Sequence, residues 1–376
     1  MRALQMVDTK TQYGHIKDEV DQAVLDVMNS SAFINGPAVR DFAAQLATYL
    51  SVKHVIPCAN GTDALQIALM ALDLQPGDEV ITPSFTYIAT TEVIALLRLK
   101  PVFVEVDPQF FCMDPVALEK AITKKTRAIV PVHLYGHAAP MQEILAIAER
   151  YGIAVIEDNA QAIGCDYFFD NGQKKKTGTM GAIGCTSSYP SKNLGAFGDG
   201  GALFTNDDAL AARIQMIANH GQSKRYYHDV VGCNSRLDTI QAAILNIKLK
   251  RLDQYNAARQ AAADFYDRAF AECPSLITPQ KASYCSHVYH QYTLRVTNGR
   301  RDALAEFLAA RSIPSMIYYP VPGHRQKMFA AFQTESCSLP VTDMLTEQVI
   351  SLPIHTELDQ EQLSCIVAGV LDFFKS

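Results

Sequence analysis

Short apolar segments alternate with amphipathic ones from residue 54 to residue 157, and this alternation limits the fold more than any other feature of the chain. The apolar segments are rich in valine and isoleucine, which favour strands. Predicted strands span residues 54–59, 80–82, 102–106, 128–132 and 153–157. Predicted helices span residues 64–72, 87–97 and 141–151, and another helix opens at Pro115 behind its capping residue Asp114. Such alternation is typical of a mainly parallel sheet with helices on both faces, so we expect an α/β domain.

The rest of the chain predicts a second, smaller α/β domain. A helical pattern begins after residue 238 and runs without interruption to about Phe270, so we expect one long helix that bridges two domains. Beyond it, the sequence predicts strands at residues 290–297 and 315–319 and a helix at residues 302–310. We therefore expect a large domain, residues 1–250, and a small C-terminal domain, residues 251–376.

Composition excludes several classes of protein. The 376 residues, 48% of them apolar, can bury a substantial core. The formal net charge of -6 argues against nucleic-acid binding, which needs a basic surface. Residues 1–10 lack the apolar core of a signal peptide and no run of about 18 apolar residues occurs, so we expect a cytoplasmic protein with no membrane partner. The nine scattered cysteines include no Cys-x-x-Cys pair and favour neither a disulfide framework nor a metal site.

Polar residues follow several predicted strands, at the ends that a parallel sheet brings to one edge. After the first strand, Gly61 and Thr62 open a helix directly. The unpaired amides of a helix N-terminus favour an anion such as phosphate, although an ordinary helix cap gives the same pattern. After the fifth strand come Asp158 and Gln161. Asp158 is a candidate ligand-binding carboxylate, or alternatively a turn former.

Residues 186–201 read TSSYPSKNLGAFGDGG and contain a candidate nucleophile. A short strand is predicted at residues 185–189, and the turn that follows places Lys192 just past the strand's end. Few side chains surround it, because the next residues are rich in glycine. A lysine becomes a useful nucleophile when desolvation or positive charge lowers its pKa from about 10.4. A solvated surface turn has the same pattern, so the assignment depends on the other groups nearby.

Together these residues describe a pocket for an aromatic aldehyde phosphate. The pocket has a helix N-terminus and a hydroxyl for the phosphate, an aromatic ring for stacking, a carboxylate for a ring nitrogen and an amine for an imine. In that order, the residues are Gly61 with Thr62, Ser187, Tyr87, Asp158 and Lys192. Pyridoxal phosphate requires this set, because the carboxylate keeps the pyridine nitrogen protonated and the displaced lysine moves a proton between substrate and cofactor carbons.

Five motifs in this order resemble those of the fold-type-I, pyridoxal-phosphate-dependent sugar-nucleotide aminotransferases of the DegT/DnrJ group. The motifs are ANGTDAL at residues 59–65, PSFTY at 83–87, EDNAQ at 157–161, PSKNLG at 190–195 and NSRLD at 234–238. The resemblance extends over nearly the whole chain. It implies an aspartate-aminotransferase-like fold, pyridoxal phosphate as the cofactor and Lys192 as the imine lysine.

The resemblance also implies roles for two residues that the pocket does not include. Gln161 would lie near the ring hydroxyl of the cofactor. Asn234 would reach the cofactor phosphate of the neighbouring subunit, so the working unit would be a homodimer with shared active sites. A helix-capping asparagine is the alternative for Asn234.

Within the family, residues 220–222 and 234–239 most resemble the enzymes that aminate UDP-2-acetamido-2-deoxy-3-oxo-glucuronate at C3, with glutamate as donor, for cell-surface polysaccharide precursors. Arg236 of the partner subunit would then bind a carboxylate of the sugar or of glutamate, since a guanidinium is a planar bidentate donor. Pairing with Asp238 is the alternative for this arginine. The resemblance places Tyr319 and His324 near the sugar. This chain has Tyr-Tyr-Pro where the family pattern has His-Tyr-Pro, so a dTDP-linked 3-oxo or 4-oxo 6-deoxy sugar is an alternative substrate.

Three other interpretations fit the sequence less well. A sugar 3-dehydratase of the same fold has histidine in place of Lys192. A regulatory protein that keeps the fold without catalysis would be expected to have lost part of the pocket, whereas this chain keeps all of it. The glycines of residues 195–201 do not form a dinucleotide fingerprint, because they lead into a strand and not into a helix.

Overall fold

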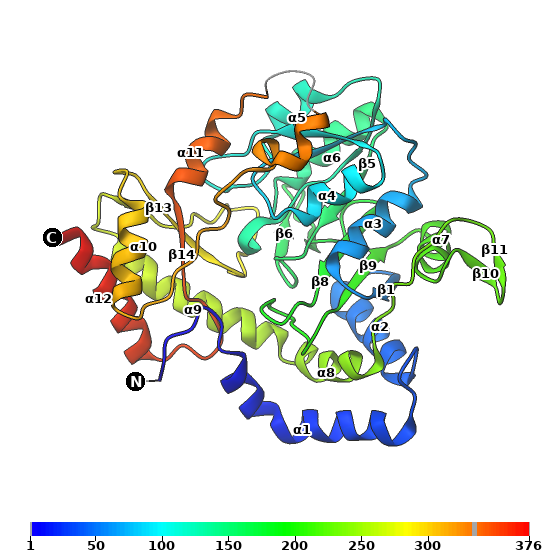
Figure 1. Cartoon of the computed structure of the whole chain (residues 1–376), viewed down its shortest axis with the longest axis horizontal. Helices are drawn as coiled ribbons and strands as arrows, with labels where there is room; N and C mark the ends of the chain where they lie inside the picture. Colours follow the sequence, from blue (N-terminus) through cyan, green and yellow to red (C-terminus); the bar gives the residue numbers. More distant parts are fainter. Residues whose placement is uncertain (1, 333–336, 376) are drawn as a thin grey trace.

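A seven-stranded sheet forms the centre of the larger part of the molecule (Figure 1). The structure is a computed structural model that describes residues 2–332 and 337–375. The strand order is β1-β9-β8-β5-β4-β2-β3. The bounds are β1 His54–Cys58, β2 Glu79–Pro83, β3 Lys100–Val104, β4 Thr126–Ile129, β5 Ala154–Asp158, β8 Ile183–Ser187 and β9 Gly201–Thr205. Within this sheet β9 runs antiparallel to both of its neighbours and the other pairs are parallel, which confirms the predicted mainly parallel sheet.

Helices cover both faces of the sheet because successive side chains of a strand point to opposite sides. Val80 of β2 packs into a core with residues of α3, α4 and α7, whereas its neighbour Ile81 packs into a second core with residues of α5 and α6. The helices are α3 Gly61–Ala71, α4 Ala89–Leu96, α5 Pro115–Ala121, α6 Met141–Tyr151 and α7 Asp208–Ala218. This α/β arrangement leaves the carboxyl edge of the parallel strands for polar groups.

The C-terminal part of the chain builds a separate core around a small antiparallel sheet. Its strands are β12 Leu276–Ile277, β13 Tyr292–Val296 and β14 Val349–Leu352, in that order. Helices α9 Leu252–Phe270, α10 Arg301–Ala310 and α12 Gln360–Lys375 pack against it, with Tyr266, Leu294 and Ile366 fully buried. The division at residue 250 stays a prediction.

Two predicted elements are wrong. The single long helix is in fact α8 Thr239–Leu249 and α9, separated at Arg251, whose φ of -111° and ψ of 0° are not helical. Neither glycine nor proline marks the break, so no local pattern could predict it. Residues 315–319 do not form a strand. Only Met316 makes a bridge, to Ser351 of β14, because the following tyrosines turn toward the carboxyl edge of the large sheet. A short hairpin, β10 Gln222–Lys224 with β11 Tyr227–His228, follows α7.

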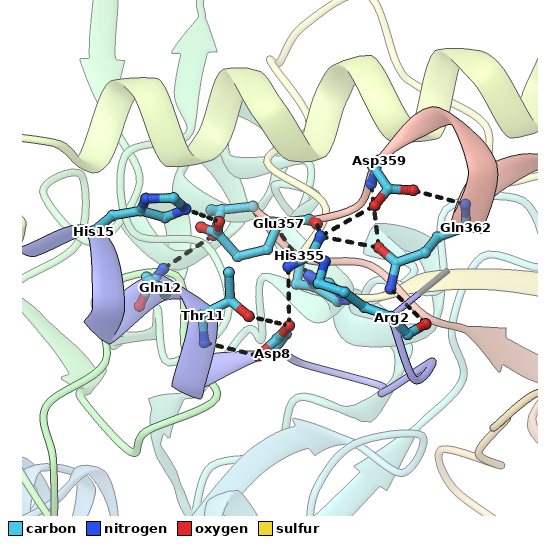
Figure 2. Close-up of polar contacts among 10 residues, drawn as sticks. Arg2, Asp8, Thr11, Gln12, His15, His355, Glu357, Asp359 and Gln362 are labelled. Carbon is cyan, nitrogen blue, oxygen red and sulfur yellow. Dashed lines mark hydrogen bonds and ion pairs between the residues drawn. The ribbon is translucent and has the colours of Figure 1, made fainter.

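The N-terminal segment joins the two parts of the molecule. Helix α1 Thr9–Ser30 lies beside α8, against which Ile16 and Val20 pack, and α2 Pro37–Leu50 follows. The residues before and within the first turns of α1 bond to the C-terminal part instead (Figure 2). Arg2 donates to Gln362 Oε1 at 3.2 Å, and His15 Nε2 lies 2.9 Å from Glu357 Oε2. Both chain ends therefore lie on one side of the molecule (Figure 1).

In the part of the chain that the structure describes, each helix is too short or too polar to cross a membrane.

Asp8 is the N-cap residue of α1 and offers a test of what stabilises the start of this helix. Its carboxylate accepts hydrogen bonds from the backbone N–H of Thr11 at 2.9 Å and from the Thr11 hydroxyl at 2.7 Å. Asp8→Ala removes the helix cap, so we expect the free energy of unfolding to fall by about 1 kcal/mol in denaturant titrations. Asp8→Asn keeps a capping oxygen and should lose less than half as much. Equal losses in the two variants would contradict the capping role.

Candidate active site

Lys192 lies on a tight loop directly after β8, at the carboxyl edge of the sheet. The Lys192 N–H donates to the Tyr189 carbonyl at 2.8 Å, and the Ala196 N–H donates to the Ser188 carbonyl at 2.7 Å. The side chain of Asn193 fixes the loop to the rest of the protein. Its Nδ2 donates to Asn256 of α9 at 2.7 Å and to the Val288 carbonyl at 2.9 Å.

Desolvation lowers the pKa of Lys192 to about 8, while the negative charge of Asp158 raises it and opposes the shift. About one tenth of the amine is therefore uncharged at pH 7, in the form that a nucleophile needs. Lys192 and Asp158, 34 positions apart in the sequence, lie close enough in the fold for their charges to interact.

Asp158 ends β5 and is buried. Its Oδ2 accepts a hydrogen bond from the Thr90 hydroxyl at 2.7 Å, and its Oδ1 accepts one from the Ala160 N–H at 3.1 Å. A carboxylate has lone pairs left after these two bonds, so it can accept another from a ring N–H. Thr90 of α4 was not anticipated from the sequence, since a threonine on a helix carries no signal of a distant partner.

Gln161 connects the carboxyl edge of the large sheet to Tyr319, which lies in the segment after α10. Its Oε1 accepts a hydrogen bond from the Tyr135 N–H at 2.7 Å, and its Nε2 donates to the Tyr319 hydroxyl at 2.9 Å. The Tyr319 ring lies 5.9 Å from the ring of Tyr87, centroid to centroid. Tyr87 is 55% exposed, so a face of its ring is available for stacking. The structure thus brings together Gln161, Tyr319 and Tyr87, which were predicted from separate motifs.

The proposed phosphate end of the site is the N-terminus of α3 beside Ser187. The cap is Asn60, whose Oδ1 accepts a hydrogen bond from the Asp63 N–H at 2.8 Å. Helix and strand approach so closely here that a Cβ on Gly61 would lie 2.6 Å from the Ser187 Cβ. The N-terminus of α3 and Ser187 therefore lie side by side, and the unpaired amides of a helix N-terminus next to a hydroxyl suit a phosphate. With Lys192 and Asp158 at the same edge, the residues fit pyridoxal phosphate.

Asn234 and Arg236 lie in a different pocket, of about 530 Å³. Its walls consist of Ile34, Ala59, Asn60, Gly198, Asp199, Asn234, Arg236, Asp238 and Gln241. The two residues are therefore not brought to the Lys192 amine of their own chain, and their predicted roles toward a neighbouring subunit stay predictions. The structure does not support the alternatives for these two residues, which were a helix cap for Asn234 and an ion pair with Asp238 for Arg236. Asp238, not Asn234, is the N-cap residue of α8, and no ion pair joins Arg236 to Asp238 among the described residues.

His324 is buried against Ser84, the residue that follows β2. Its Nδ1 lies 2.8 Å from the Ser84 hydroxyl, and its Nε2 lies 3.4 Å from a carboxylate oxygen of Asp343. Burial lowers the pKa of His324. These contacts fix the segment that leads from Tyr319 against the large domain, and a direct contact of His324 with substrate stays a prediction.

Glu157, the residue before Asp158 in β5, holds the end of the strand through its own hydrogen bonds. Its structural role was not predicted from the sequence. It is fully buried, and its carboxylate accepts from the His133 ring at 2.9 Å and from the Gly178 N–H at 2.7 Å. Only the tertiary structure distinguishes it from its neighbour Asp158, because the two acidic residues point to opposite faces of the strand.

The close contact at Gly61 gives a test of the phosphate site. Gly61→Ala pushes the N-terminus of α3 away from Ser187, so we expect the Kd for pyridoxal phosphate to rise about tenfold or more in fluorescence titrations of the apoprotein. Gly14→Ala is the matched control, because a Cβ on Gly14 meets no atom within 4 Å. A normal Kd in a folded Gly61→Ala protein would place the phosphate elsewhere.

Comparison with known proteins agrees with this geometry. Residues 14–371 match the DegT/DnrJ/EryC1/StrS aminotransferase family. The chain is 46% identical to a UDP-2-acetamido-2-deoxy-3-oxo-D-glucuronate aminotransferase of Pseudomonas aeruginosa, with 98% of this chain and 99% of the relative covered. It is 45% identical to a pleiotropic regulatory protein of Geobacillus stearothermophilus, with 98% of each covered. It is 40% identical to a dTDP-3-amino-3,4,6-trideoxy-alpha-D-glucose transaminase of Streptomyces venezuelae, with 98% and 95% covered.

A solved structure is also similar to this chain over its whole length. The crystal structure of S. venezuelae DesV in complex with a ketimine intermediate superposes with a TM-score of 0.95 at 39% identity, and the match covers 100% of both chains. The predicted fold type is confirmed by this match and by the sheet order. The chain therefore belongs to the DegT/DnrJ/EryC1/StrS aminotransferase family and is a pyridoxal-phosphate-dependent enzyme.

Proposed function

We propose that the enzyme transfers the amino group of glutamate to C3 of a 3-oxo nucleotide sugar, UDP-2-acetamido-2-deoxy-3-oxo-glucuronate, for cell-surface polysaccharide precursors. The single observation that carries a catalytic role is the Lys192 amine, whose pKa is lowered to about 8 beside Asp158 at the carboxyl edge of the sheet. The choice of sugar is supported by the Pseudomonas relative and by the HGQ and NSRLDT segments at residues 220–222 and 234–239.

Bound pyridoxal phosphate supplies an electron sink that stabilises negative charge on the substrate carbon. Asp158, held by Thr90 and by the Ala160 N–H, is placed to keep the ring nitrogen protonated. Lys192 holds and returns the proton at Nζ, and its low-dielectric surroundings keep the amine uncharged often enough to act as a base. The bond from Gln161 to Tyr319 fixes the Tyr319 ring next to the ring of Tyr87.

Arg236 and Asn234 would act in the partner's site of a homodimer. Both line a pocket that also includes Asn60, the cap of the phosphate-facing helix, so the second subunit would approach close to the cofactor. A guanidinium there suits a carboxylate, of the uronate or of glutamate. We expect this dimer to work in the cytoplasm.

A dTDP-linked 3-oxo or 4-oxo 6-deoxy sugar is the second candidate substrate. The S. venezuelae relative supports it, as does Tyr318, which stands where the family pattern has histidine. A purely regulatory role, suggested by the name of the Geobacillus relative, is less compatible with a desolvated Lys192.

The first test is the visible absorption spectrum of the purified protein with pyridoxal phosphate. We expect a band of lysine-bound cofactor that disappears when glutamate is added. Lys192→Ala should show no such band and no turnover, since the attachment point and the base are both lost. Substantial turnover by this variant would overturn the mechanism, and absence of the band in the wild-type protein would favour a regulatory role.

The second test distinguishes the sugars. With the glutamate-treated enzyme, we expect the lysine-bound band to return on addition of UDP-2-acetamido-2-deoxy-3-oxo-glucuronate and to return far more slowly with dTDP-3-oxo-6-deoxy sugars. Arg236→Lys keeps the charge but loses the bidentate geometry, so its KM for the carboxylate-bearing substrate should rise about tenfold. Faster return with the dTDP sugars would replace the proposed substrate with the alternative.

The third test uses the pKa of Lys192. A pKa near 8 leaves about one tenth of the amine uncharged at pH 7, and this fraction rises with pH until it is complete above about pH 9. In stopped-flow mixing of apoprotein with pyridoxal phosphate, we therefore expect the rate of lysine attachment to rise through a midpoint near pH 8. A midpoint near 10 would show that the amine is solvated.

A further inference from the structure

The hydroxyl of Ser84 makes two hydrogen bonds to one residue of a distant segment. Ser84 follows β2 and is fully buried. Its Oγ accepts from the His324 backbone N–H at 3.0 Å and lies 2.8 Å from the Nδ1 of the same residue. The Nε2 of His324 lies 3.4 Å from a carboxylate oxygen of Asp343, which favours a proton on Nε2. Nδ1 is then the acceptor, and the Ser84 hydroxyl donates to it.

Serine, histidine and aspartate in contact in this order also form the catalytic triad of many hydrolases. Burial excludes that role here. The surface of Ser84 is 0% exposed, and its oxygen already bonds to the backbone and the ring of His324, so no substrate can reach it. The contacts of Ser84 therefore serve to hold the segment that carries His324 against the end of β2.

A second attachment lies next to the first. The Gly323 N–H donates to the Ser84 carbonyl at 2.8 Å. A Cβ on Gly323 would lie 2.9 Å from a ring carbon of Phe103 in β3, so the segment also lies close against the adjacent strand. Ser84 thus bonds through its backbone and its side chain to two consecutive residues, which fixes the segment in position and in orientation.

This attachment lies close to Tyr319 along the chain. Only three residues separate Tyr319 from Gly323, and two of the three are prolines, at positions 320 and 322. Proline restricts φ to about −65°, so the connection is stiff. The Tyr319 ring lies 5.9 Å from the ring of Tyr87, which follows Ser84 by three positions. The two segments therefore contact each other at both ends, and the position of one limits where the Tyr319 ring can lie.

We propose that Ser84 is a positioning residue for Tyr319. Its bonds to His324 fix the segment that follows Tyr319. The Tyr319 hydroxyl is thereby kept at Gln161, and the ring is kept beside Tyr87. Ser84 itself touches neither cofactor nor substrate. This inference rests on the proposed places of Gln161 and Tyr87 at the cofactor ring, and it adds the group that fixes the residue between them.

The test measures the Kd for pyridoxal phosphate by equilibrium dialysis of the apoprotein, with no substrate present. Ser84→Ala removes both bonds of the hydroxyl to His324, so Tyr319 and Gln161 are no longer held in place. We therefore expect the Kd to rise about fivefold or more.

Thr82→Val is the matched control for loss of a buried hydroxyl from the same strand. The Thr82 hydroxyl donates to the Val130 carbonyl at 3.1 Å, and Thr82 is also fully buried. This variant should lower the thermal midpoint as Ser84→Ala does, but it should leave the Kd within about twofold of wild type. A rise in Kd as large as that of Ser84→Ala would show that any loss of stability weakens cofactor binding, and would overturn the inference.

Tyr319→Ala shows whether Ser84 acts through Tyr319. If it does, adding Ser84→Ala to the Tyr319→Ala protein should raise the Kd by less than about twofold more. Effects that multiply in the double variant would overturn the inference, and so would an unchanged Kd in folded Ser84→Ala. If Ser84→Ala does not fold, His324→Leu removes the bond between ring and hydroxyl from the other side and gives the same comparison.

The single variants also keep failure of this inference separate from failure of the proposed function. A raised Kd in Tyr319→Ala with a normal Kd in Ser84→Ala would reject only the role of Ser84. A normal Kd in folded Tyr319→Ala would show that Tyr319 does not lie at the cofactor, and the proposed site and the inference would both fail. The transfer of an amino group to a sugar is tested independently by Lys192→Ala, because the dialysis contains no substrate.

Discussion

Burial of the central sheet on both faces is the constraint on which the rest of the structure depends. Val80 and Ile81 enter opposite cores, so neither face of the strand is open to water or ligand. Polar chemistry is then restricted to the strand ends, because an unpaired polar group between sheet and helices would lose its hydrogen bonds. The parallel strands bring their carboxyl ends to one edge, and Asp158, Ser187 and Lys192 follow two adjacent strands there.

Burial also determines the protonation of the Lys192 amine. Desolvation favours the neutral form of Lys192, and the carboxylate of Asp158 favours the charged form, so the amine has a pKa of about 8. The positions of both groups depend on contacts outside the site, which include Thr90 for the carboxylate and Asn193 for the lysine loop. Supporting contacts of this kind fix the geometry that a catalytic group requires.

The smaller part of the molecule contributes to the site through two connecting segments. One carries Tyr319, which bonds to Gln161, and the other carries His290, whose neighbour Val288 bonds to Asn193. The N-terminal residues add a third connection, because Arg2 and His15 bond to the C-terminal residues while α1 packs on α8 (Figure 2). Movement of the small sheet would therefore shift the Lys192 loop, because Val288 bonds to Asn193.

Hydrophobic period and short motifs are local properties of the chain, and they were enough to predict the α/β class, the strands between residues 54 and 157 and the family. Local patterns could not show the break at Arg251 or the loss of the strand at residues 315–319, since both depend on contacts with distant segments. Only the folded chain shows that Thr90 bonds to Asp158 and that the Val288 carbonyl bonds to Asn193 of the Lys192 loop. The reason is that hydrogen-bond partners and desolvation are decided by what packs around a residue, and those neighbours are far away in the sequence.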